Sequence, residues 1–256
     1  MKVTIMINNK KPKAYCFGFF IVLLLFFSCQ KQNYDASQIV AKSIEVHGGL
    51  KKWRSIKEIS FDKKTILYFP DGTIEKELNQ HQMFSFVNGL KGSIQDLNKE
   101  GMHGFDFDGK SFLVTDNDSI RKVEDVNEIE SFKYSFFASH YVICQPFELL
   151  SENAELIYNG MSLVDNKEYY SVNVSYKDDD KDSDKWTYFF DDKTFNLMSC
   201  KVDLTDHTSL IENLKYDNST GFKFNAYRKS YRLNEVGEKE YLRAEYWYSN
   251  YEVILK

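Results

Sequence analysis

The sequence has little proline and little cysteine, with three prolines and four cysteines among 256 residues. Aromatic residues are abundant instead: they make up 16% of the chain, including 21 phenylalanines and 17 tyrosines. Aromatic side chains suit a pleated, half-buried surface, and proline is disfavoured in central strands. The composition therefore favours a large β-sheet.

An excess of positive charge is also lacking, because 33 basic residues stand against 38 acidic ones and the formal net charge is −5. Nucleic-acid phosphates require a basic face, so the balance argues against nucleic acid as a partner. It also argues against broad electrostatic adhesion to anionic lipid head groups. Any membrane attachment must then come from apolar groups.

Long hydrophobic runs are scarce, and the clearest one lies near the start of the chain, from Ala14 to Phe27. Three lysines precede this run and Ser28-Cys29 ends it. A run below about 20 residues is too short for a membrane span, which disfavours a transmembrane anchor and favours a secretory signal peptide. We predict a signal peptide over residues 1–28, a lipidated tether over 29–34 and a single domain over 35–256.

The cysteine directly after the predicted cleavage site resembles the lipobox of bacterial lipoproteins, although Phe26 stands where leucine is usual and Leu25 lies one place earlier. The resemblance implies that Cys29 carries acyl chains and that these attach the protein to a membrane. Two or three acyl chains give lasting attachment, whereas one is marginal. The expected location is the cell envelope of a Gram-negative bacterium, at the outer membrane.

Cys144 and Cys200 remain in the mature chain, in a compartment that permits disulfides. Both are flanked by apolar or strand-like residues. The sequence leaves open a bridge between them or two buried free thiols.

A helix is predicted from Ala36, where Asp35 precedes apolar residues spaced three and four apart, to His47-Gly48-Gly49. Leu50, Trp53 and Ile56 then share one face of a short helical turn. One or two further helices are expected between Val123 and Ile157, in the segments 128–141 and 146–156. Strands are predicted at 59–69, 73–78, 81–87, 105–107, 112–115, 170–176, 186–190, 195–204, 210–216, 222–233 and 241–248.

Four segments together resemble envelope lipoproteins allied to the LolA/LolB-like lipoprotein carriers: ASQIVAKSIEVHGGLKKWRSIKEISF, DFDGKSF, WTYFFDDKTFNL and EYLRAEYWYSNYEV. The sharpest part is His47-Gly48-Gly49 with Trp53, expected to be a structural signature. The resemblance implies an α+β fold in which a curved antiparallel sheet forms an unclosed β-barrel with covering helices. It also implies a hydrophobic cavity for acyl chains, and it supplies no catalytic residue.

Motifs for other chemistry are weak. Residues 104–111 match the phosphate-loop pattern GxxxxGK[ST], but two aspartates inside it would repel phosphate and a strand follows where a helix is required. The alternating aspartates from Asp178 to Asp184 lack the glycine and glutamate of a calcium-binding loop. The five histidines have no zinc-site spacing, and no nucleophile lies beside a base in the sequence. We therefore expect no enzyme activity, no metal and no cofactor.

Seven aromatic residues are the candidate lining of an acyl-chain pocket, because burying methylenes requires apolar area of suitable shape. They are Phe84, Phe86, Phe105, Phe107, Trp186, Tyr188 and Phe190. The predicted function is a monomeric, non-catalytic carrier or receptor for a lipid or an acylated protein. The alternative is an anchored structural or interaction module whose groove is filled by its own side chains, such as Ile39, Val40, Ile44 and Trp53.

Overall fold

The structure is a computed structural model, and it describes residues 34–117, 119–177 and 183–256. The predicted signal peptide and Cys29 lie outside the described residues, as does most of the aspartate-rich segment after Lys177. Residues 34–256 form one compact unit.

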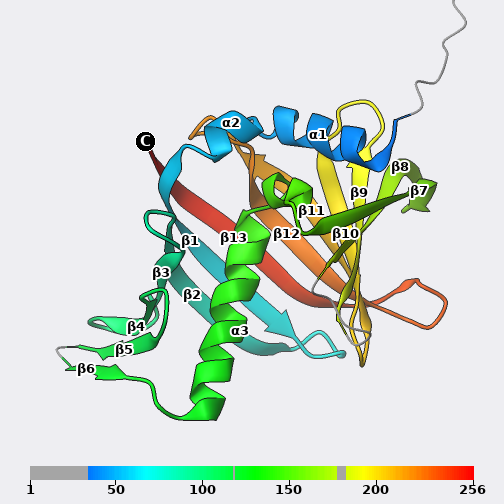
Figure 1. The fold of residues 1–256 in the computed structure, drawn as a ribbon. Helices are drawn as coiled ribbons and strands as arrows, with labels where there is room; N and C mark the ends of the chain where they lie inside the picture. Colours follow the sequence, from blue (N-terminus) through cyan, green and yellow to red (C-terminus); the bar gives the residue numbers. More distant parts are fainter. Residues whose placement is uncertain (1–33, 118, 178–182) are drawn as a thin grey trace, which may run out of the picture. The chain divides into compact units, whose positions relative to one another are not determined.

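A single antiparallel sheet of thirteen strands makes up most of this unit (Figure 1). The spatial order is β6-β5-β4-β3-β2-β1-β13-β12-β11-β10-β9-β8-β7, so the pairing of β1 with β13 joins the two halves of the chain. The sheet does not close on itself, and β6 and β7 are its two edges. The strands are β1 Ile56–Tyr68, β2 Ile74–Ser85, β3 Lys91–Asp96, β4 His103–Phe107, β5 Phe112–Asp116, β6 Ser119–Lys122, β7 Ala154–Val164, β8 Lys167–Tyr176, β9 Lys185–Asp191, β10 Leu197–Asp203, β11 Thr208–Asp217, β12 Phe224–Leu233 and β13 Lys239–Leu255.

The helices gather at one end and on one face of the sheet (Figure 1). Helices α1 (Ala36–Val46) and α2 (Leu50–Trp53) lie along one end of the strands, and α3 (Val126–Ile143) crosses the face that we call the inner face. A short 3-10 helix, η1 (Phe147–Leu150), follows α3. Among the helices of the described residues, none combines the length and the apolar character needed to cross a bilayer.

The α1 helix begins and packs as its sequence indicates. The Asp35 side chain accepts a hydrogen bond from the backbone N–H of Gln38, and the Gln38 side chain accepts one from the backbone N–H of Asp35. This capping box satisfies two donors that a helix start leaves unpaired. The predicted apolar face, including Ile39, Val40 and Ile44, is buried.

The structure differs from the predicted secondary structure in several places, and the strands predicted at 73–78 and 81–87 form the single strand β2. The helix expected over 146–156 is only the four-residue η1, and β7 begins at Ala154. The short strands β3 and β6 have too few apolar residues to show a period, and the sequence did not predict them. Ile56 starts β1 instead of continuing the helical turn.

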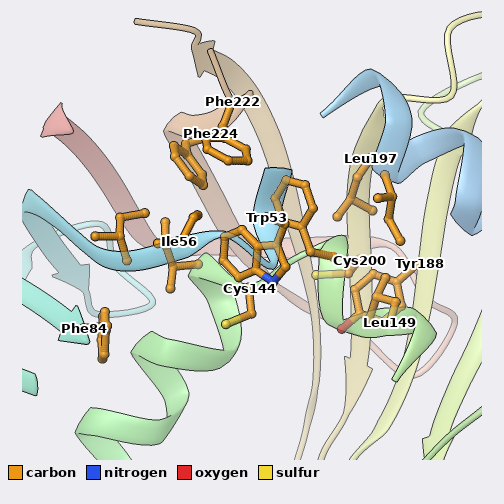
Figure 2. Close-up of a cluster of buried hydrophobic side chains, with 14 of the residues drawn as sticks. Trp53, Ile56, Phe84, Cys144, Leu149, Tyr188, Leu197, Cys200, Phe222 and Phe224 are labelled. Atoms are coloured by element: carbon orange, nitrogen blue, oxygen red, sulfur yellow. The ribbon is translucent and has the colours of Figure 1, made fainter. Parts of the chain in front are cut away.

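The part of the hydrophobic core shown in Figure 2 lies between the α1 and α2 end of the sheet, η1 and the end of α3, and the core continues along α3 to Phe136, Phe105 and Phe112. Trp53 is at its centre: its ring stacks on Phe147 at 4.4 Å between centroids, and its Nε1 donates to Glu148 Oε1 at 2.9 Å. Buried aromatic rings that also find a polar partner for an N–H are large contributors to stability. Trp53 therefore stabilises the packing of α2 against η1.

The His47-Gly48-Gly49 segment turns the chain from α1 toward α2. The backbone at Gly48 has a φ of 128°, and a Cβ there would lie 2.7 Å from the Phe222 ring. His47 is buried, its Nδ1 lies 2.8 Å from the Ser43 carbonyl oxygen, and its Nε2 has no hydrogen-bond partner. Glycine is required at position 48 because its φ is positive and its backbone lies so close to the Phe222 ring.

Burial of His47 makes stability depend on pH. Burial lowers the pKa of its imidazole to about 4, since the charged form loses its hydration. In the unfolded chain the ordinary pKa is 6.5. Between these two values the unfolded state binds more protons, so acidification from pH 6.5 to 4 should lower the free energy of unfolding by about 3 kcal/mol through His47.

Urea unfolding at a series of pH values measures this effect. His47→Gln should show a smaller change in the free energy of unfolding between pH 6.5 and 4. Only the pH-dependent change within each protein is compared, so a constant loss of stability caused by the substitution does not affect the result. Equal slopes for both proteins would contradict the assignment.

Candidate functional site

A cavity of about 870 Å³ lies between α3 and the inner face of the sheet. This volume falls within the range of about 300–1,000 Å³ for ligand pockets. Along β1, the core residues Ile56, Ile59 and Phe61 come first, and the cavity residues Lys63, Thr65 and Leu67 follow. The interior is therefore filled near α1 and hollow toward the other end of the strands.

Side chains from α3 and from strands in both halves of the sheet line this cavity. The apolar and aromatic ones are Leu67, Leu78, Ile94, Tyr134, Phe137, Ala138, Tyr141, Val142, Tyr176, Trp186, Val202, Leu204, Ile211, Tyr246 and Tyr248.

One side of α3 is fixed to the sheet by aromatic contacts. The fully buried Phe136 ring lies 5.2 Å from Phe84 and 5.1 Å from Phe107, and the Ser139 hydroxyl donates to Gln82 Oε1. Ala138 and Tyr141, on the same helix, face the cavity. The helix therefore forms a wall of the cavity while its other side belongs to the core.

The structure places one of the seven predicted pocket aromatics, Trp186, in the lining of this cavity. The other six lie in or against the core. Phe84, Tyr188 and Phe190 are fully buried, Phe105 is 8% exposed, and Phe86 and Phe107 are partly buried. Ile39, Val40, Ile44 and Trp53 fill part of the interior, as the alternative prediction supposed. A ligand role for the seven aromatics stays a prediction.

A cluster of hydroxyl groups connects the cavity wall to the core, since Tyr141, Gln145 and Tyr176 line the cavity and Tyr188 lies in the core. The Tyr141 and Tyr188 hydroxyls are hydrogen-bonded to each other, Tyr176 donates to Tyr141 at 3.2 Å, and Gln145 Nε2 donates to the Tyr188 hydroxyl at 2.8 Å. Burial raises the pKa of Tyr141 and Tyr188 well above the usual range. These phenols are therefore neutral, and each provides a hydrogen-bond partner for another buried hydroxyl group.

The sequence analysis missed the positive charge of the cavity. Four basic residues line it, namely Lys63, Arg228, Arg232 and Arg243, against one acidic residue, Asp184. A signal was present in β12, where Arg228 and Arg232 lie four and eight positions after the apolar Phe224. Side chains at even spacing share one face of a strand, so both arginines could have been assigned to the inner face.

Residues 15–252 match the sequence model of DUF6503, a family of unknown function. The chain belongs to the DUF6503 family. No curated protein matches its sequence. Solved structures of other proteins share the fold of this chain, including two with a TM-score of 0.53. A LolA superfamily protein from Nitrosomonas europaea is 10% identical, with a TM-score of 0.53 over 87% of this chain and 94% of the other.

A DUF1329 family protein from Desulfovibrio piger is 8% identical, with a TM-score of 0.53 over 86% of this chain and 94% of the other. At such identity the likeness shows the fold alone. The DUF6503 protein has a LolA-like fold, an unclosed antiparallel sheet with few helices, and this confirms the predicted resemblance and fold class.

The DUF6503 structure brings one cysteine beside a histidine, a pair that the sequence analysis did not identify. Cys144 Sγ lies 3.3 Å from His140 Nε2. Burial raises the pKa of the Cys144 thiol well above its usual value and lowers the pKa of His140 to about 4. The proton therefore stays on sulfur, and the pair lacks the thiolate that nucleophilic catalysis requires.

Cys144 and Cys200 are both buried and free, so the bridge left open by the sequence does not form. The phosphate-loop match in the DUF6503 chain is the β4–β5 hairpin, where Asp108 Oδ1 accepts from the backbone N–H groups of Lys110 and Ser111 at 2.8 Å each. Strand β5 follows, so the helix that a phosphate loop requires is absent from this described segment. Within the described part of the chain, no group of three or more potential ligands could hold a metal.

Proposed function

We propose that this protein binds a lipid or the acyl chain of an acylated protein in the α3 cavity, as a non-catalytic carrier or receptor. The observation that carries the proposal is a hollow interior of about 870 Å³ with an aromatic and aliphatic lining. Burying an acyl chain in such a lining is favourable by about 0.8 kcal/mol per methylene. A LolA-like fold, shared with the LolA superfamily protein, is consistent with this use.

The proposed location is the cell envelope of a Gram-negative bacterium, at the outer membrane, with acyl chains on Cys29 holding the domain near the lipid. The tether over 29–34 and the domain over 35–256 belong to this proposal. A monomer without cofactor, metal or nucleic acid is the proposed working form.

Photoactivatable C16 probes test the function directly. Cells that produce the full-length protein are fed a C16 probe with either a carboxylic acid or an uncharged head group. The probe should cross-link to the protein in a saturable way. Proteolytic digestion should map the cross-linked residues to α3 or to the facing strands. Absence of labelling with both probes, while total membrane protein is labelled, would rule out lipid binding and favour the interaction module with a self-filled core.

Anchoring is tested separately by Cys29→Ala. The variant should leave the membrane fraction or accumulate as uncleaved precursor, because no sulfur is available for acylation. Cys144→Ala is the matched control and should fractionate like the wild type. A Cys29→Ala protein of mature size that remains with membranes would contradict the proposed anchor.

A further inference from the structure

We propose that the cavity selects amphiphiles with an anionic head group, and that Arg228 binds this head group inside the cavity. The inference rests on the proposed lipid binding and narrows its substrate class. It predicts that a fatty acid or a lipid phosphate enters with its head toward the core end of the cavity.

Arg228 is a buried charge that lacks a carboxylate partner. The side chain is 4% exposed, Nε donates to Asn213 Oδ1 at 2.9 Å, and Nη2 lies 3.9 Å from Cys200 Sγ. Across residues 34–117, 119–177 and 183–256, no Asp or Glu forms an ion pair with Arg228.

The guanidinium is nevertheless charged. Burial acts to lower its pKa, but the pKa of arginine is so high that the side chain keeps its proton at neutral pH. A buried charge without a counterion is costly. An anion that binds beside it would offset this cost, and the planar fork of arginine suits a carboxylate or a phosphate.

The surroundings of Arg228 distinguish it from Arg243, another arginine of the cavity lining. Arg243 donates to Glu75 and to the Tyr68 carbonyl oxygen at 2.8 Å, so its charge is already compensated. Arg232 donates to the Ser209 hydroxyl, and the Lys63 ammonium lies 5.4 Å from the Tyr246 ring centroid. Positive charge that is not paired with a carboxylate therefore gathers along the inner face around Arg228.

The position of Arg228 along its strand sets the orientation of the ligand. Arg228 pairs with Tyr246 on β13 and lies between the core residue Phe224 and the β12–β13 turn. Apolar lining residues such as Leu67 and Leu204 lie near other turns at that same end of the strands. A head group at Arg228 would leave the hydrocarbon chain to extend toward these turns.

The charge also separates two classes of cargo. Acyl chains on a protein are joined through uncharged ester and amide groups, so they offer no anion to Arg228. A free fatty acid or a phosphate-headed lipid does. The inner face thus favours the second class even though the whole chain has a formal net charge of −5.

Competition binding tests the inference with full-length protein in phosphatidylcholine nanodiscs. A photoactivatable hexadecanoate labels the cavity, and unlabelled hexadecanoate, hexadecyl phosphate and hexadecanol compete at equal measured mole fractions in the bilayer. We expect at least one of the two anions to compete about tenfold or more better than the alcohol, the gain typical of a charged hydrogen bond. Stronger competition by hexadecanoate indicates a fatty acid, and stronger competition by hexadecyl phosphate indicates a phosphate-headed lipid.

Arg228→Met should remove most of this preference, whereas Arg228→Lys should keep part of it. Arg54→Met removes a positive charge that lies outside the cavity lining and should keep the preference. Thermal melting checks folding: a ligand-binding role predicts that Arg228→Met is no less stable than the wild type, because it removes an uncompensated buried charge.

Hexadecanol competing as well as both anions, with the cavity still labelled, would overturn the anion preference and leave lipid binding intact. No labelling by any probe would instead reject the proposed function. If Arg228→Met does not fold, the ranking of the three competitors on the wild type still decides whether the cavity prefers anionic head groups.

Discussion

Ala138→Trp should weaken capture of the hexadecanoate probe by about tenfold or more, because the new side chain occupies part of the space that an acyl chain needs. Ala138 is an exposed residue of α3 that lines the cavity. Its backbone is helical, and tryptophan is tolerated in helices at a small cost. The change should therefore alter binding and leave folding intact.

Ala41→Trp is the matched control, since Ala41 is an exposed alanine of α1 outside the cavity lining. Both variants carry the same added ring on a helix. Cross-linking yield as a function of probe concentration measures the difference. Equal capture by Ala138→Trp and the wild type would show that the ligand does not occupy the space beside α3.

Trp53→Ala should lower the free energy of unfolding by about 3–5 kcal/mol, the usual cost of deleting a buried aromatic ring. The variant loses the stack on Phe147 and the hydrogen bond to Glu148, and a void opens where α2, η1 and β1 meet. The total stability of a domain is about 5–15 kcal/mol, so the loss is a large part of it. Urea unfolding measures the effect.

Trp247→Ala is the corresponding control. Trp247 stacks on Tyr227 at 5.2 Å, but it is only partly buried. Its removal should cost clearly less than that of Trp53. Similar losses for both variants would mean that Trp53 does not hold α2 to η1 as the contacts indicate.

The sequence predicted the elements whose caps and apolar spacing lie within one continuous segment of the chain. The Asp35 capping box, the apolar spacing from Ala36 to Ile44 and the glycines after His47 define α1 without help from other strands. The α3 helix was predicted over 128–141 and extends from Val126 to Ile143. The curved sheet was expected from composition and from the resemblance.

Elements that depend on their neighbours were missed. β7 is an edge strand with exposed residues on both faces and a register shift between Tyr158 and Met161, so its sequence shows no period of two. β3 has Ile94 as its one large apolar residue and forms because β2 and β4 supply its hydrogen bonds. Such strands carry no signal of their own.

The cavity was the hardest feature to predict, because a sequence pattern does not say which buried side chains meet each other and which leave space. Phe84 and Tyr188 alternate in strands as pocket residues would, yet both belong to the solid core. Net charge misled in a similar way. The acidic balance argued against nucleic acid and broad adhesion to anionic lipid head groups, and it gave no sign that four basic residues gather on one inner surface.

An open sheet has two edge strands, and their unpaired backbone N–H and C=O groups can form hydrogen bonds with a strand of another copy. Here β6 is only four residues long, all four of its residues are exposed, and its Arg121 is paired with Glu128 of α3. At the other edge, β7 is interrupted by the irregularity around Gly160. Short, charged or bulged edges resist strand addition. The protein should therefore not form fibrils through pairing of its edge strands at high concentration.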